Sequence, residues 1–246
     1  MNRPIIANEL RGWRTYALIW CAAVVVSTVA DTMGNVVSQG EASELSILTV
    51  FAQGLRNTVQ LGAIFSMILG GLIISKEEDE KRIEFLLSHP VMRLEIGLAK
   101  LAALSLLVLF LNIVLLVTGI VVLEVLKSGA GYDVGAFLAL WLSFVVLVCF
   151  FAAAGMLFSA FVTKGGVVVG FSIGISLILG VLNALKNVEN ELFRLVSYVS
   201  PYRYFDIHLI LDTGRPDTAF LAGFIGISVV FIGASLILYR RREFAV

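Results

Sequence analysis

The chain has 246 residues, of which 59% are hydrophobic and only 15% are charged. In soluble domains about a quarter of all residues are usually charged, so this composition excludes an ordinary water-soluble domain. Its 18 basic and 18 acidic residues cancel to a formal net charge of zero, which excludes the basic field expected of a nucleic-acid-binding protein.

Six apolar segments are long enough to cross a membrane as helices. Crossing about 30 Å of hydrocarbon takes about twenty residues at roughly 1.5 Å each. Asp31 interrupts the first segment, so we expect it near the outer end of that span or in contact with protein. The sequence therefore predicts a single all-α membrane domain over residues 1–246, with spans at approximately residues 16–37, 59–75, 101–123, 134–161, 167–185 and 218–239.

The segment before the first span, residues 3–14, is predicted to be an interfacial helix on the inner membrane surface. Ile6, Leu10 and Trp13 recur at helical spacing, and three arginines lie elsewhere around the helix. An anchoring turn that only sets the orientation of the chain is the alternative, because basic flanks are common at cytoplasmic amino termini.

The distribution of basic residues predicts that both termini are cytoplasmic. With an inside amino terminus, 12 of the 18 lysines and arginines face the cytoplasm, as the positive-inside rule requires. Six spans return the carboxyl terminus to the same side. There Arg240, Arg241 and Arg242 follow the last span directly and are placed to contact anionic lipid.

Residues 76–100 form the one sizeable cytoplasmic loop of this topology. A charged, helix-favouring run leads into Ile83, Leu86 and Leu87 at helical spacing, and Pro90 disfavours further helix. The loop is therefore predicted to contain a short amphipathic helix beneath the bilayer, followed by a basic return into the third span. A charged loop that is merely solvated is the alternative.

This loop resembles the first cytoplasmic loop of ABC-2 type transporter permeases, the membrane subunits of type V ABC exporters. The resemblance rests on the acidic cluster at residues 77–80, the run Ile-Glu-Phe-Leu-Leu-Ser-His-Pro-Val at 83–91, and the basic residues Arg93 and Lys100. It implies that the loop is a coupling helix, which docks in a cleft of a separate ATPase subunit. The residues expected at that contact are Glu78, Glu80, Glu84, Phe85, Leu86, Leu87, Pro90 and Arg93.

The resemblance extends over the whole chain. It includes Glu9-Leu10-Arg11 in the interfacial segment and Ser-Pro-Tyr-Arg-Tyr-Phe at residues 200–205. Family members often have Gly-Thr after the acidic cluster, where this chain has Lys81-Arg82, so the start of the coupling helix is left open. The resemblance implies a bacterial or archaeal cell-membrane protein that pairs with a second copy or a sibling permease. ATP and Mg are expected on the ATPase, with no cofactor in this chain.

Small residues form ridges on two of the predicted spans. Such ridges let helix backbones approach closely inside a membrane. The resemblance implies that these two helices lie near a dimer axis and line the translocation route, and packing within one subunit is the open alternative. The residues concerned are Gly62, Ser66 and Gly70 in the second span and Gly166, Gly170 and Gly174 in the fifth.

The last outer loop, residues 186–217, is too long for a tight connection. Leu192, Leu195, Val196 and Val199 have helical spacing, and nearby tyrosines suit a membrane interface. We expect an external re-entrant or surface helix that caps the pore. Simple interfacial anchoring is the alternative.

Motifs for catalysis and metal binding are missing from the sequence. It has no G-x-x-x-x-G-K-[ST] phosphate loop, so energy is expected from another subunit. Residues 170–174 match the letters of a nucleophile elbow, but that motif needs a strand-turn-helix corner and these residues lie within a span. Cys21 and Cys149 lie in apolar segments, and the two histidines are far apart, so no metal site is indicated.

The function predicted from these features is that of a non-enzymatic permease subunit of an ABC exporter, driven by ATP hydrolysed on a separate ATPase. One alternative is a secondary carrier driven by an ion gradient, which would bury ionisable residues at the middle of its spans. The third to sixth predicted spans have no acid or base there, which disfavours a carrier. A non-transporting membrane scaffold or resistance protein is the other alternative, and no substrate is indicated.

Overall fold

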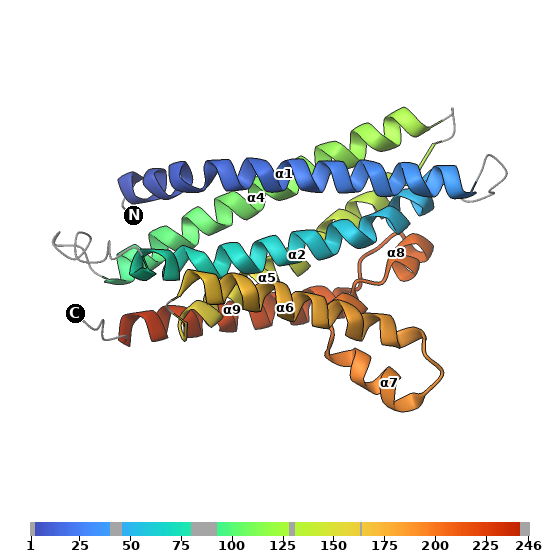
Figure 1. Ribbon diagram of the computed structural model, residues 1–246. Coiled ribbons are helices and arrows are strands. Elements are labelled where there is room, and N and C mark those ends of the chain that lie inside the picture. The colour runs from blue at the N-terminus through green and yellow to red at the C-terminus, as the bar shows by residue number, and fades with distance from the viewer. Residues whose placement is uncertain (1–2, 40–45, 80–92, 128–130, 163, 242–246) are drawn as a thin grey trace.

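The structure is a computed structural model that describes residues 3–39, 46–79, 93–127, 131–162 and 164–241 (Figure 1). All the regular secondary structure of these residues is helical. The α-helices and the shorter 3-10 helices, labelled η, are α1 (Arg3–Gln39), α2 (Ile47–Asp79), α4 (Arg93–Leu126), α5 (Val134–Ser159), α6 (Gly165–Ala184), η1 (Leu185–Asn187), α7 (Glu191–Val196), η2 (Ser197–Val199), η3 (Pro201–Tyr204), α8 (Ile207–Thr213) and α9 (Thr218–Arg241).

Six of these helices are long and apolar enough to cross a membrane, which confirms the predicted fold class. They correspond to the six spans predicted from the sequence, although several bounds differ. The candidate spans are Ile6–Ser38, Ile47–Ser75, Glu95–Leu126, Val134–Ser159, Gly165–Asn187 and Thr218–Arg240.

The second spanning helix begins well before the predicted span. The polar residues Gln53, Arg56 and Asn57 lower the hydropathy of residues 47–58, so sequence reasoning assigned them to the preceding loop. In the structure they are the first three turns of α2, because Leu48, Phe51 and Leu55 recur on one face of the helix and are buried. The polar residues lie on its other faces.

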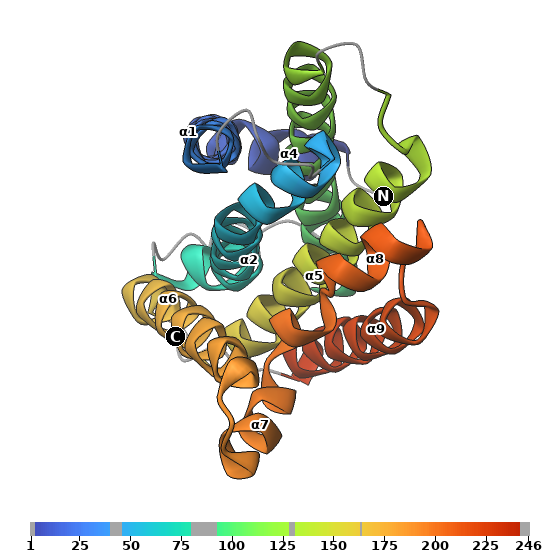
Figure 2. The ribbon, with the colours of Figure 1, turned by 90° about the vertical axis from the view of Figure 1, so that its right-hand side faces the viewer.

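The predicted interfacial segment and first span form one continuous helix, α1, of 37 residues. A straight helix of this length would measure about 55 Å, well beyond the thickness of a hydrocarbon core of about 30 Å. In Figure 2 the first turns of α1 leave the axis of the rest of the helix and extend towards α4. The amino-terminal turns are thus a bent extension of the first spanning helix, and their position on a membrane surface stays a prediction.

The bundle has two ends, which differ in the elements that lie there. The start of α1, the end of α2, the start of α4 and the end of α9 lie together at one end, called here the terminal end (Figure 1). The short helices α7 and α8 lie at the opposite end, called the far end.

Helix α2 is the centre of the bundle, since 78% of its most apolar window is buried, compared with 22% for α6 and 11% for α9. It packs most closely on α5, where glycines remove the side chains that would hold the helices apart. A Cβ atom added to Gly70 would lie 2.1 Å from the carbonyl oxygen of Ala152, and one added to Gly155 would lie 2.1 Å from that of Met67. Much of the surface of α6 and α9 is therefore free to face lipid or another chain.

Candidate functional site

Most of the predicted coupling residues lie outside the described residues, namely Glu80, Glu84, Phe85, Leu86, Leu87 and Pro90. Glu78 belongs to the last turn of α2, and Arg93 is the first residue of α4. The helix ends that flank residues 80–92 both lie at the terminal end of the bundle (Figure 1). The coupling role of these residues stays a prediction.

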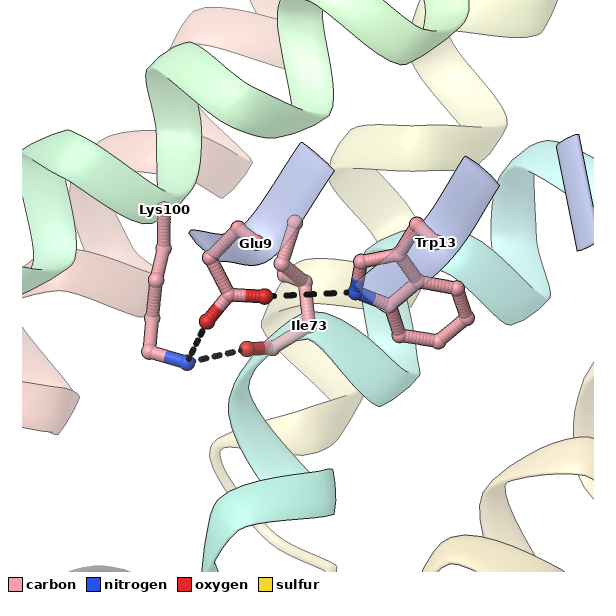
Figure 3. A network of polar contacts seen from close by, with 4 residues as sticks. All are labelled: Glu9, Trp13, Ile73 and Lys100. Carbon is pink, nitrogen blue, oxygen red and sulfur yellow. Dashed lines mark hydrogen bonds and ion pairs between the residues drawn. The ribbon is translucent and has the colours of Figure 1, made fainter. Parts of the chain in front are cut away.

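A buried lysine ties three helices together close to these helix ends. The side chain of Lys100, on α4, is 0% exposed, and its Nζ donates to the carbonyl oxygen of Ile73 on α2 at 2.5 Å. Nζ also lies 3.3 Å from Oε1 of Glu9, on α1. The second carboxylate oxygen of Glu9 accepts a hydrogen bond of 3.3 Å from the indole Nε1 of Trp13 (Figure 3).

This network compensates for the cost of burying the charged ammonium group of Lys100. A buried ammonium group is tolerated only when it is paired and hydrogen-bonded, and removal of one partner from such a pair costs about 3–5 kcal/mol. Glu9 is held in place because Trp13 lies one helical turn further along α1. Glu9 and Lys100 are 91 residues apart, and sequence analysis noted each of them without indicating that they pair.

The small-residue ridge of α2 packs within the subunit. A Cβ atom on Gly62 would lie 2.7 Å from the ring of Phe144, and Gly70 lies against the backbone of α5. Ser66 is fully buried, and its hydroxyl has no hydrogen-bond partner among the described residues. In this chain the ridge serves the contact between α2 and α5.

The corresponding ridge of α6 lies in a different environment. Cβ atoms added to Gly166, Gly170 and Gly174 would meet no described atom within 4 Å. This side of α6 therefore faces away from the described part of the chain and is free to meet another molecule. Its role in a permease dimer stays a prediction.

At the far end, polar side chains join α1 to α2. Asp31 accepts hydrogen bonds from Asn57 Nδ2 at 3.1 Å and from Ser27 Oγ at 3.0 Å. Ser27 and Thr28 also lie within 3.3 Å and 3.1 Å of the hydroxyl of Thr58. Asp31 thus contacts protein near the end of its span, as its position in the sequence predicted.

The predicted outer segment contains helices, but they are short. Asn190 caps α7 by accepting a hydrogen bond of 2.9 Å from the backbone N–H of Leu192. Leu192 and Leu195 are 70% and 63% exposed, so the described residues do not cover the apolar side of this helix. Leu192, Leu195 and Val196 lie in α7, as their helical spacing predicted, whereas Val199 lies in η2. The capping of a pore stays a prediction.

Tyr202 anchors the outer segment to the bundle. Its phenol oxygen lies 2.5 Å from the hydroxyl of Ser176 on α6, and its ring stacks on Phe151 at a centroid distance of 5.2 Å. Ser200 strengthens the contact by donating to the carbonyl oxygen of Leu179 at 2.7 Å. Burial raises the pKa of the Tyr202 phenol well above its ordinary value, so this group stays neutral.

A cavity of about 220 Å³ adjoins this anchor, between α2, α6, η1 and the start of α8. It is called here the far-end cavity. Its wall includes Arg56 and Gln60 from α2, Lys186 from η1, and Asp206 and His208 beside the start of α8. Sequence analysis missed this site because it assigned Arg56 and its neighbours to a loop. In residues 47–58 the apolar residues Leu48, Phe51 and Leu55 have helical spacing, and polar residues lie between them. This pattern is the signal that could have revealed the cavity.

The described residues contain no group of three or more His, Cys, Asp or Glu side chains arranged to hold a metal ion. A family model described as ABC-2 family transporter protein matches residues 6–244. The chain belongs to the ABC-2 transporter family. The family resemblance inferred from the sequence is therefore confirmed over nearly the whole chain, and it identifies a membrane component of a transporter. Comparison with curated proteins gave no significant match.

Proposed function

We propose that the chain is the permease subunit of an ABC exporter and that a separate cytoplasmic ATPase supplies its energy. The observation that carries this proposal is the family match over residues 6–244 in a chain with six candidate spans. The sequence has no phosphate loop, so ATP binding is assigned to the partner.

The arrangement of the terminal end supports coupling to such a partner. The end of α2 and the start of α4 flank the predicted coupling residues and lie beside the start of α1 (Figure 1). Lys100 ties these three helices through Glu9 and the carbonyl oxygen of Ile73. If the ATPase displaces residues 80–92, we expect the three helices to move together, because the polar network opposes their separation.

The exposed side of α6 supports assembly with a second permease. Its glycine ridge presents a backbone that another helix can approach closely. Only 22% of the most apolar window of α6 is buried within the chain. We assign this surface to contact with a second copy or a sibling permease.

A secondary carrier is less compatible with the positions of the charges. Among the described residues, Lys100 is the one charged side chain that is fully buried, and it lies close to the terminal end of α4. A carrier coupled to an ion gradient would need ionisable groups near the middle of its spans.

The proposal is tested by isolating the tagged full-length chain from its native membranes in mild detergent and identifying the proteins that accompany it. We expect a protein with a phosphate-loop motif, and we expect ATP hydrolysis by the complex to end when the phosphate-loop lysine of that partner is replaced. The chain purified without the partner is the control. ATP turnover by the chain alone, or transport that needs an ion gradient and no ATP, would overturn the proposal.

A further inference from the structure

The described wall of the far-end cavity contains two cationic side chains and one carboxylate. Arg56 and Lys186 both line it, and neither forms an ion pair with a described residue. Asp206 is the one carboxylate in the described wall. We propose that this cavity binds a small anionic group, a phosphate that is either free or part of a lipid headgroup. The assignment of the site to the export route rests on the proposed function, whereas binding of the anion does not.

The two nearby carboxylates, Asp206 and Asp31, form no ion pair with Arg56 or Lys186. Asp206 accepts the backbone N–H groups of His208 and Leu209 at 3.0 Å and 3.3 Å, as the cap of α8. Asp31 lies in an adjoining hollow that shares Arg56 and His208 with the cavity, and it accepts hydrogen bonds from Asn57 and Ser27. The cations therefore keep free donors, which an anion can bind by charge-assisted hydrogen bonds.

The surrounding wall adds neutral hydrogen-bonding groups. A Cβ atom on Gly180 would lie 2.7 Å from Nε2 of Gln60, so the glycine makes room for this amide between α2 and α6. Asn183 also lines the cavity, and its Oδ1 is buried without a hydrogen-bond partner among the described residues. Unpaired buried polar atoms are rare in folded proteins. This oxygen accepts hydrogen bonds, so it needs a donor, such as a water or a hydroxyl of the ligand, and it does not bind the anionic group itself.

The size and surroundings of the cavity suit such a ligand. A volume of about 220 Å³ accommodates a phosphate group with part of the molecule that carries it. Apolar residues such as Val59 and Phe205 also line the cavity, while Arg56 is exposed and Lys186 is half-buried. Arginine and lysine at one site are a common arrangement for binding carboxylate and phosphate groups.

The experiment measures the local potential and anion binding at a single cysteine. Asn187, an exposed residue of the cavity wall, is replaced by cysteine in a full-length chain in which Cys21 and Cys149 are changed to alanine. The chain is placed in nanodiscs of phosphatidylcholine. Its rates of modification by an anionic and by a cationic methanethiosulfonate reagent are compared with those of a free thiol.

We expect the cysteine at position 187 to react faster with the anionic reagent than with the cationic reagent, when each rate is divided by the rate of the same reagent with a free thiol. A unit charge about 6 Å away in water changes the local concentration of a monovalent ion about threefold, so loss of one cation should lower the ratio of the two rates about tenfold at low salt. R56Q and K186Q test this expectation. R215Q is the matched control, because Arg215 is exposed beyond α8 and does not line the cavity.

Anion binding is measured by protection of the same cysteine. We expect inorganic phosphate to slow its modification by a neutral reagent with saturation, and we expect the R56Q/K186Q double variant to lose this effect. Nanodiscs that contain phosphatidylglycerol but no free phosphate test a lipid headgroup as the source of the anion. Protection in either arm supports the site and identifies the source.

Two outcomes would overturn the proposal. One is a faster reaction with the cationic reagent, which would show that the cavity is not positive. The other is a lack of protection by both phosphate and anionic lipid. Neither measurement requires the ATPase, so failure of the anion site is distinguishable from failure of the proposed permease function.

Discussion

Lys100 shows how a single charged residue is accommodated inside an apolar bundle. It is fully buried, and its ammonium group contacts the carboxylate of Glu9 and the carbonyl oxygen of Ile73. Replacing one member of a buried ion pair leaves the other uncompensated, whereas replacing both by apolar residues can be nearly neutral. The pair is therefore suited to a double-mutant cycle.

We expect Glu9→Leu to destabilise the chain by about 3 kcal/mol, because it leaves the Lys100 ammonium without its carboxylate. Lys100→Met combined with Glu9→Leu should cost clearly less than the sum of the two single changes. Thermal unfolding of the full-length chain in detergent measures all three variants. Glu95→Gln, at an exposed position of α4, is the control and should shift stability by less than about 0.5 kcal/mol. Additive effects of Glu9 and Lys100 would contradict this prediction.

Gly70 and Gly170 form a matched pair of glycines within spanning helices. Gly70→Ala should destabilise the chain by about 1–3 kcal/mol or more, since its Cβ would overlap the carbonyl oxygen of Ala152. In a monomer, Gly170→Ala should be neutral or slightly stabilising, because its Cβ would meet no described atom within 4 Å and alanine favours a helix. Thermal unfolding checks both variants. Equal effects of the two substitutions would contradict the packing described here.

At the scale of elements, α2 connects the two ends of the bundle. Its first half carries Arg56 and the amides Gln53, Asn57 and Gln60 of the far-end cavity, and its last turns lead into the predicted coupling segment. Between them, glycines bring it against α5. Helix α2 therefore runs from the far-end cavity to the predicted coupling segment.

The coupling segment is tested through its apolar residues. Leu86→Ala with Leu87→Ala should weaken retention of the ATPase and uncouple transport, because loss of a buried anchor at a protein interface often costs about 2 kcal/mol or more. Glu78→Gln should have a milder effect that depends on salt, since an exposed ion pair contributes under about 1 kcal/mol. Co-purification and ATP-driven transport are compared at matched membrane levels. Full association and transport of the double leucine variant would remove the coupling role from this segment.

At the scale of the whole molecule, the structure places the start of α1 and the end of α9 at the same end of the bundle (Figure 1). The excess of basic residues predicts that this terminal end faces the cytoplasm. On that prediction the short helices α7 and α8 lie outside, together with the far-end cavity. This orientation is open to a direct test.

A cysteine that replaces Asn190, the exposed cap of α7, should react with a membrane-impermeant reagent in intact cells. A cysteine that replaces Glu95, near the start of α4, should react only after the membrane is permeabilised. Labelling of the two positions is compared in the background that lacks Cys21 and Cys149. The reverse pattern would show that the chain is inserted in the opposite orientation.

Much of the overall organisation followed from the sequence because it depends on local properties of the chain. Continuous apolar segments revealed six spanning helices, and the residues of the loop at 76–100 indicated the family that the family match confirms. Helix bounds were less accurate where polar and buried residues share one helix, as in residues 47–58. There the mean hydropathy is lowered by residues that face a cavity.

The sequence by itself determined the class of the protein, the number of spans and the family, since composition, periodicity and short motifs are read along the chain. Only the tertiary structure decided that Glu9 meets Lys100 and that Arg56 and Lys186 share a cavity. It also showed that the glycines of α2 face α5 while those of α6 face outwards. These pairings depend on how distant helices pack, and packing between residues far apart in the chain leaves no periodic signal in a single sequence.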